Sequence, residues 1–564
     1  MEKGFRHLSV LENGWLLKDE EIYPVTRVDI HDGLPEHFMT LYVDAIEGRI
    51  RESTRLMRTD HPEVLGLVYL ENPTTTPDIE TVTLDDLYSD AEHLYGSYAH
   101  VETCVDRQDC KTTEPLAISD LENGFIYTPA FDPLVLFDDP FAEVNAYRNI
   151  TNINSWIRHS FGWDSLFDGE TWIHVKVGRD WDNAGYYAGS SRTPPHIVFG
   201  VAEQNYAYDA DTAHHEFGHA INDGLWTHGW MTLDSFGTDT SMFAIEEALA
   251  DIWAFSYSGD PVANAYILAS RNADNNTSCP RSLLGEGHYD ARILTGFAWD
   301  LSEEIGLDAV SHIFFRTAAF LEKRETFHSL VEKLMVSVES LASEETTGVS
   351  QWHVDVIQET ARSRGLLDEA CANRLVPFYE SEHRYAIGYG RNRTHKLNYP
   401  FGFQWEIRIP YDGAIARLRL EWIYPEFDVD GNPVSPGYRV YLRKGKPVSM
   451  TELTDPVAGE DCVSVVSDLH IEKSPSQVSY PLPSDGPLSK GDKLYVLLYA
   501  DTDEPFIALK ADLRFGSVSS SLSSYAYGAE MEEPSAQSGG CGAVPIAGSP
   551  SSMACLFDAL LPFK

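Results

Sequence analysis

Cysteine pairs, basic residues and long apolar runs are all scarce in this sequence. None of the seven cysteines stands in a Cys-x-x-Cys pair, which argues against a cysteine-rich zinc knuckle. No segment reaches the roughly 18 consecutive apolar residues of a membrane-spanning helix. The 42 Lys and Arg residues are outnumbered by 87 Asp and Glu, so the formal net charge is −45. This charge argues against nucleic acid and anionic membranes as partners.

The length and composition predict a folded protein of several domains. The 564 residues suffice for two to four domains, and the 43% of hydrophobic residues supports a large core. Cys104 and Cys110 flank a short polar loop. A disulfide between them suits an oxidising compartment, two reduced thiols suit a reducing one, and the sequence leaves both open. No feature specifies an oligomeric state.

The spacing of apolar residues divides the chain into four regions and predicts an α+β fold. Residues 1–118 carry short apolar runs between turn residues, which indicates a β-rich region. Residues 119–375 are mostly of helical periodicity, with a strand-like insert at 171–201. Helices are expected at about 142–157, 209–224, 241–258, 292–304, 308–323 and 350–365.

The last two regions differ from the helical part in period and composition. From 398 to 516 the period changes to two, as in Phe403, Trp405 and Ile407, which predicts a β-sandwich domain. Residues 517–564 are rich in Ser and Gly, and we expect a flexible tail there.

The segment from His215 to His219 contains a metal-binding pattern. The two histidines are four residues apart on an expected helix, so both imidazoles project from one face and can bind a single ion. Glu216 lies one position round the helix, where its carboxylate can reach a water on that ion. A surface helix with two solvated histidines is the alternative interpretation. Catalytic Zn²⁺ usually takes three protein ligands, so one more is expected.

The third ligand is expected on the helix predicted at 241–258. Glu247 completes a His₂Glu site, and Asp251 follows one turn later on the same face. Asp251 can therefore accept a hydrogen bond from the far nitrogen of a histidine ligand, which fixes its tautomer. Glu246 is expected to face elsewhere. These residues together favour a zinc site over a pair of solvated histidines.

These motifs resemble those of the gluzincin metallopeptidases, such as thermolysin and the fungalysins. Glu247 to Asp251 matches their Glu-x-x-x-Asp element, and the segment from Gly285 to Ile293 is similar to the one that supplies a transition-state histidine. The likeness covers about residues 120–370 in consistent order. It implies a two-lobe, thermolysin-like peptidase domain that hydrolyses protein or peptide substrates as a zinc endopeptidase.

The resemblance assigns roles to further residues. His288 would donate to the oxyanion, and Asn183 and Ala184, in a segment similar to the substrate-binding edge strand, would hold the peptide. Asp211 matches a calcium-ligand position, but no acidic residue stands a turn beyond Asp251, so calcium stays open. Residues 220–246 contain no tyrosine, where relatives commonly place an oxyanion partner, and Tyr289 or His228 are the alternatives.

The flanking regions are interpreted through the same resemblance. The segment 41–50 is similar to the last strands of an inhibitory propeptide, which predicts a zymogen. A secreted or cell-surface protein is expected, although the first residues contain no signal peptide. Two other functions remain open: a catalytically impaired adhesion protein that binds through the β-sandwich, and a different zinc hydrolase such as an aminopeptidase.

Overall fold

The computed structural model describes residues 7–517 apart from short internal segments. The segments left out are 19–20, 32–38, 45–49, 56–63, 89–91, 121–123, 131–135, 164–170, 190–192, 227–230, 264, 268–270, 344–347, 390–397, 424–425, 428–432, 435–436, 453–462, 472–476, 481–486 and 503–505. The tail expected at 517–564 therefore lies, beyond Ser517, outside the described residues, and so does His228.

The N-terminal part of the described chain consists of strands. Four of them pair antiparallel in sequence order: β1 (His7–Lys18), β2 (Glu21–His31), β3 (Met39–Asp44) and β4 (Ile50–Arg55). Of the segment expected to be propeptide-like, 41–50, residues 41–44 lie on β3 and Ile50 begins β4, whereas 45–49 lie outside the described residues. A separate hairpin follows, made of β5 (Leu65–Tyr69) and β6 (Ile79–Thr83).

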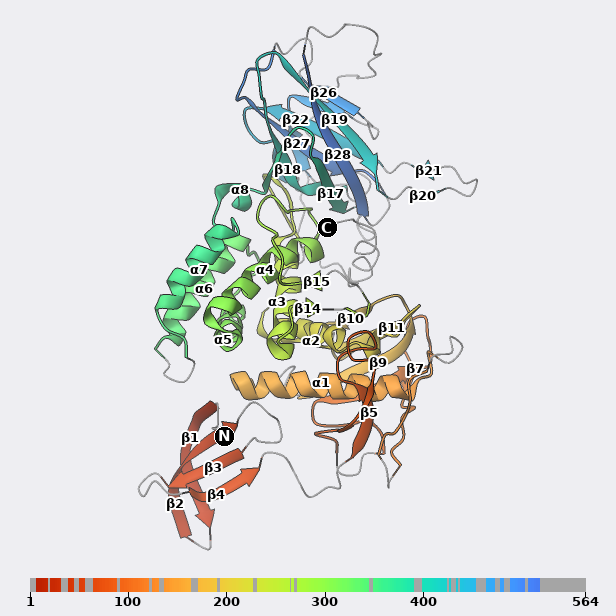
Figure 1. Cartoon of the computed structure of the whole chain (residues 1–564), viewed down its shortest axis with the longest axis vertical. Coiled ribbons are helices and arrows are strands. Elements are labelled where there is room, and N and C mark those ends of the chain that lie inside the picture. Colours follow the sequence, from red (N-terminus) through yellow and green to blue (C-terminus); the bar gives the residue numbers. More distant parts are fainter. Residues whose placement is uncertain are drawn as a thin grey trace.

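A mixed five-stranded sheet and one long helix form the next layer (Figure 1). The sheet order is β10-β11-β9-β7-β8. Its strands are β7 (Ala99–Cys104), β8 (Thr113–Glu114), β9 (Ile173–Asp180), β10 (Ala184–Tyr187) and β11 (His196–Val201). The sheet therefore unites residues on both sides of the boundary expected at 118.

Helix α1 (Pro140–Phe161) covers this sheet. Its sequence defines both of its ends and supplies the buried face. The Asp139 side chain accepts the Phe141 N–H at 3.0 Å, and Pro140 occupies the first turn, where its missing N–H costs nothing. The helix ends at Gly162, whose φ of 65° is left-handed and favours glycine.

Seven further α-helices and one short 3-10 helix (Tyr206–Tyr208) follow in the described chain, and three of the α-helices, α2, α3 and α4, lie in the middle of the molecule (Figure 1). Their bounds are α2 (Ala210–Leu225), α3 (Ser241–Ser258), α4 (Gly287–Ile305), α5 (Leu307–Ala318), α6 (Phe327–Leu341), α7 (Trp352–Ser363) and α8 (Glu369–Ala372). Sequence analysis missed α6, although Thr326 and Ser329 form a capping box at its start.

Two sheets make up the C-terminal part of the described chain. The first has the order β16-β18-β27-β22-β25: β16 (Leu375–Phe378), β18 (Pro400–Arg408), β27 (Lys493–Ala500), β22 (Tyr438–Lys444) and β25 (Leu469–Ile471). The second has the order β17-β28-β19-β26: β17 (His383–Tyr389), β28 (Phe506–Ser517), β19 (Ala414–Trp422) and β26 (Gln477–Tyr480).

Strand β18 is buried on both faces, which differs from the one-sided burial that a period of two predicts. The second face packs against the helical region. The Gln404 side chain, fully buried, donates to the Phe236 carbonyl at 3.1 Å and to the Val448 carbonyl at 2.7 Å. The Thr238 hydroxyl donates to the Pro400 carbonyl at 2.5 Å. The C-terminal sheets are thus joined through β18 to the segment 236–238, which lies just before α3, the third long helix of the chain.

Short hairpins and two disulfides complete the described structure. The hairpins pair β12 (Thr232–Asp234) with β13 (Gly237–Asp239), β14 (Val262–Ala263) with β15 (Arg271–Asn272), β20 (Glu426–Phe427) with β21 (Pro433–Val434), and β23 (Ser449–Glu452) with β24 (Val463–Val466). Disulfides join Cys104 to Cys110 and Cys279 to Cys371. Within the described residues, no helix has the length and apolar character needed to cross a membrane.

Candidate metal centre

Helix α2 supplies two histidines because its start is firmly defined. The buried Asp209 is its N-cap, and its carboxylate accepts the backbone N–H of Thr212 at 3.3 Å and the Thr212 hydroxyl at 2.6 Å. From there His215 and His219, four residues apart, lie on the same side of the helix. Their Nε2 atoms are 3.0 Å apart.

Helix α3 approaches α2 closely at Gly218. A Cβ added to Gly218 would lie 2.7 Å from the Cα and 2.9 Å from the carbonyl oxygen of Ala250, inside normal contact distance. Only glycine therefore allows the two helices to pack at this separation. The close crossing brings Glu247 over the two histidines.

The side chains of His215, His219 and Glu247 converge in one site, with His215 and Glu247 buried and His219 half-buried. One ligand atom from each lies within 4.8 Å of the others. Glu247 Oε2 is 3.4 Å from His215 Nε2, and Glu247 Oε1 is 3.9 Å from His219 Nε2. Within the part of the chain that the structure describes, this is the only such group of three or more metal-binding side chains. Asp211, considered for calcium, is not part of one.

Two more acids hold the far nitrogens of the histidines. His215 Nδ1 lies 2.8 Å from Asp251 Oδ1, and His219 Nδ1 lies 2.6 Å from Glu246 Oε1. If each Nδ1–H donates to its carboxylate, both Nε2 atoms present lone pairs towards Glu247. Glu246 therefore does not face elsewhere, as the sequence had led us to expect. The tight crossing at Gly218 places it against α2 as well.

The carboxylates around His219 favour a positive charge in this site. Burial disfavours protonation of His219, but the carboxylates of Glu246 and Glu247 outweigh burial and raise its pKa to about 10. Two facing imidazole lone pairs beside a buried carboxylate repel one another unless a proton or a cation lies between them. Two imidazoles and one carboxylate are the donor set of catalytic zinc sites, so the residues present fit this ion.

Glu216 faces the same site from α2. Its side chain is buried, its Oε2 atom has no hydrogen-bond partner, and the backbone N–H of Tyr186 binds its carboxylate. Burial raises the pKa of Glu216, while the two histidines act in the opposite direction. An acceptor with a raised pKa and a free oxygen is suited to take a proton from a substrate or water.

His288 lies beside Glu247, in the first turn of α4. Helix α4 begins at Gly287, earlier than the expected 292, because Glu286 is its N-cap and accepts the Tyr289 N–H at 3.1 Å. The second contact of Glu286 is with His288 Nδ1, at 2.7 Å. His288 Nε2 is 3.3 Å from Glu247 Oε1. Burial opposes protonation of His288, but Glu247 and Glu286 outweigh it and raise its pKa to about 9.

Asn183 and Ala184 lie at the strand nearest to Glu216. Ala184 begins β10, which is the last strand of its sheet among the described strands and pairs antiparallel with β11 through Ala184 and Phe199. Asn183 directly precedes it and is buried. Because the Tyr186 N–H of this strand reaches Glu216, the strand and the candidate base are neighbours.

Sequence analysis missed Arg271, Glu286 and also Tyr389, whose hydroxyl lies 3.5 Å from Glu286 Oε1. Arg271 Nη2 lies 2.5 Å from Asp251 Oδ1 and 3.9 Å from Glu247 Oε2. The sequence did contain a signal for Glu286, since this residue directly precedes the helix that carries His288. For Arg271 and Tyr389 the sequence contains no such signal, because only the tertiary fold brings their distant segments to the metal centre.

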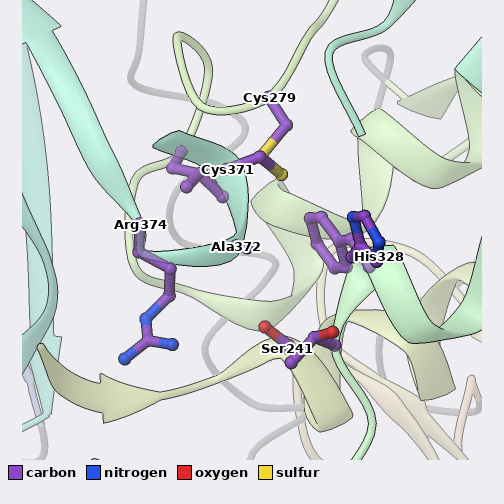
Figure 2. Close-up of a pocket in the computed structure, with 9 residues that line it drawn as sticks. Ser241, Cys279, His328, Cys371, Ala372 and Arg374 are labelled. Carbon is purple, nitrogen blue, oxygen red and sulfur yellow. A yellow bond between two sulfur atoms is a disulfide. The ribbon is translucent and has the colours of Figure 1, made fainter. Parts of the chain in front are cut away.

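A pocket close to these helices is not part of this site. Figure 2 shows it beside Ser241, the first residue of α3, and the Cys279–Cys371 disulfide. The pocket has room for about one water molecule. It is lined by Ser241, Cys279, Leu283, Thr326, Phe327, His328, Cys371, Ala372 and Arg374. No proposed metal ligand lines it, so it offers no substrate site for the metal centre.

Comparison with known proteins shows distant similarity to solved structures only. No protein-family model matches the chain, and no curated protein sequence matches it. Among solved structures, the precursor of protealysin, a metalloproteinase from Serratia proteamaculans, aligns with 48% of this chain and 87% of its own. The TM-score is 0.36 and the identity is 11%. A similarity this low supports no functional argument, so the function must be argued from the site.

Proposed function

We propose that the protein is a zinc-dependent endopeptidase. The observation that supports this most directly is the convergence of His215, His219 and Glu247, with their ligand atoms within 4.8 Å of one another and Glu216 buried beside them. A structural ion would need no adjacent proton acceptor with a free oxygen. This site has one in Glu216 Oε2.

The side chains His215, His219 and Glu247 would hold the ion. Bound Zn²⁺ would supply Lewis-acid polarisation of the scissile carbonyl and would make an attacking water more acidic. Glu216 would accept the proton of that water and pass it to the departing amine, as a general base and then a general acid. The raised pKa of Glu216 brings its basicity nearer to neutral pH, where both transfers must occur.

His288 would stabilise the developing oxyanion. A doubly protonated imidazole can donate from both nitrogens, and the raised pKa of His288 favours that form at neutral pH. The Nδ1–H of His288 would keep its hydrogen bond to Glu286, so that Nε2–H can donate to a substrate oxygen. An ion bound by Glu247 would cancel part of the attraction that raises this pKa, but the contribution of Glu286 would persist.

The substrate class that fits this site is an extended peptide. A peptide can add as a further strand along the edge of β10 that faces away from β11, with Ala184 binding through its backbone and Asn183 through its amide. Added there, its backbone would run past Glu216, which contacts Tyr186 of the same strand. The β10 sheet and the α2–α4 helices would be the two lobes of a thermolysin-like domain. Two disulfides support a secreted or cell-surface location.

Metal analysis combined with a hydrolysis assay tests the proposal. The purified chain should contain one zinc ion, and it should hydrolyse casein until a zinc chelator is added. Glu216→Gln should keep the zinc and lose activity by about 10²–10⁴-fold, because an amide cannot accept the proton. Zinc without hydrolysis in the unaltered protein would point instead to an impaired, binding-only relative. Loss of zinc together with activity in Glu216→Gln would make Glu216 structural.

A further inference from the structure

The C-terminal sheets contact the segment that carries His288. The Ile387 N–H on β17 donates to the Leu284 carbonyl at 2.8 Å. A Cβ added to Gly285 would lie 2.8 Å from the Ile387 carbonyl oxygen and 3.3 Å from the Phe403 ring. Figure 1 shows β17 at the end of the C-terminal strands nearest the helices. The turn that opens α4 is therefore packed directly on β17 and β18.

Tyr389, the last residue of β17, extends this contact to the site. Its side chain is buried, and its hydroxyl accepts the backbone N–H of Gly287, the first residue of α4. The same hydroxyl lies 3.5 Å from Glu286 Oε1. That oxygen is also the one that faces His288 Nδ1 at 2.7 Å. Tyr389, Glu286 and His288 therefore form a continuous chain that ends beside Glu247.

The start of α4 is also packed tightly on its opposite side, against α3. A Cβ added to Gly287 would lie 2.1 Å from the Phe243 ring on α3, so α3 and α4 meet without a gap there. The Phe243 ring contacts the His288 ring edge-on, with centroids 5.0 Å apart. Phe243 restrains the imidazole from one side, and the hydroxyl of Tyr389 restrains its carboxylate partner from the other.

We propose that Tyr389 is a positioning residue for His288, and that the C-terminal β-sheets are a structural part of the catalytic site. This inference rests on the proposed peptidase function. The Tyr389 hydroxyl holds the Glu286 carboxylate and the first N–H of α4 in one arrangement. Glu286 then keeps the imidazole turned so that Nε2 faces the reaction centre. Tyr389 itself does not contact substrate.

Tyr389→Phe tests this because it removes only the hydroxyl. We expect kcat on a peptide substrate to fall about 3- to 10-fold, the effect of one modest hydrogen bond, with KM and zinc content unchanged. The matched control is Tyr499→Phe, which removes another buried hydroxyl of the same sheets, one that donates to the Asn398 carbonyl at 3.2 Å. The control should leave kcat unchanged. Equal losses of kcat in both variants would overturn the proposal.

A double variant shows whether the effect passes through His288. In the His288→Ala background, Tyr389→Phe should cause no further loss of kcat, because the group that it positions is gone. If the two losses multiplied, Tyr389 would act by another route and the proposal would be wrong.

An independent readout applies even to a protein without activity. With ¹⁵N-labelled histidine, the Nδ1–H signal of His288 is identified by its loss in His288→Ala. We expect its exchange with solvent to be at least several-fold faster in Tyr389→Phe and unchanged in Tyr499→Phe. Unchanged exchange in Tyr389→Phe would refute the positioning role. Absence of zinc and hydrolysis in the unaltered chain would refute the peptidase and leave this measurement to decide on the hydrogen-bonded chain.

Discussion

Removing the charge of Asp251 should weaken zinc binding, and the contacts of Asp251 allow the size of the loss to be estimated. Its Oδ1 atom lies 2.8 Å from His215 Nδ1 and 2.5 Å from Arg271 Nη2, so it orients one ligand and also neutralises a cation. Asp251→Asn keeps an oxygen for the Nδ1–H and removes the charge, whereas Asp251→Ala removes both. Loss of such a partner typically reduces metal affinity 10–100-fold, or about 1.4–2.7 kcal/mol. We expect about 10-fold for Asn and about 100-fold for Ala.

Arg271 provides the internal check on this reasoning. Once Asp251 has lost its charge, the guanidinium of Arg271, already 3.9 Å from Glu247 Oε2, should pair more strongly with that ligand and compete with the ion. Arg271→Gln in the Asp251→Asn background should therefore recover part of the affinity. Competition against a chromophoric zinc chelator measures all three variants. Glu359→Gln, which neutralises an exposed acid on α7, is the control for net charge. Unchanged affinity in Asp251→Ala would show that His215 does not bind the metal in this orientation.

Two further changes separate chemistry from architecture. His288→Ala should retain zinc and reduce kcat about 10²–10³-fold with little change in KM, measured by steady-state hydrolysis of a peptide, because an oxyanion donor acts mainly in the transition state; full activity would assign that role elsewhere. Gly218→Ala should lower the free energy of unfolding by about 1–3 kcal/mol in urea titration and also reduce zinc content, since the added Cβ must push Ala250 away and carry Glu247 with it; a variant as stable and as zinc-rich as the parent would contradict the packing argument.

Local sequence signals predicted the central helices well and the contacts between distant segments poorly. Helices α2 and α3 begin within about a residue of their expected positions because Asp209 and the apolar spacing define them locally. The early start of α4 depends on Glu286, an uncommon N-cap whose role is clear only once it also contacts His288. The residue at which such a helix begins is decided by tertiary packing.

The residues around the site illustrate the same limit. A helix viewed alone places Glu246 and Glu247 about 100° apart, so only one was expected to face the histidines. Both reach them because Gly218 lets α3 cross α2 at contact distance. Tyr389 lies more than a hundred residues from His219, in a region of different periodicity, and no local pattern connects the two. The division into four regions and the roles of the site residues stay predictions.

The Cys279–Cys371 disulfide has a consequence for a protein that would share its compartment with peptidases, itself included. The bond closes a segment that contains α4, α5, α6 and α7. After a single backbone cut anywhere between the two cysteines, the two fragments remain covalently connected through the disulfide, and the helices on each side stay within reach of their packing partners. Nicked molecules would thus migrate as one species on a non-reducing gel and as two fragments after reduction. A cut made by the protein itself between Cys279 and Cys371 need not release a fragment.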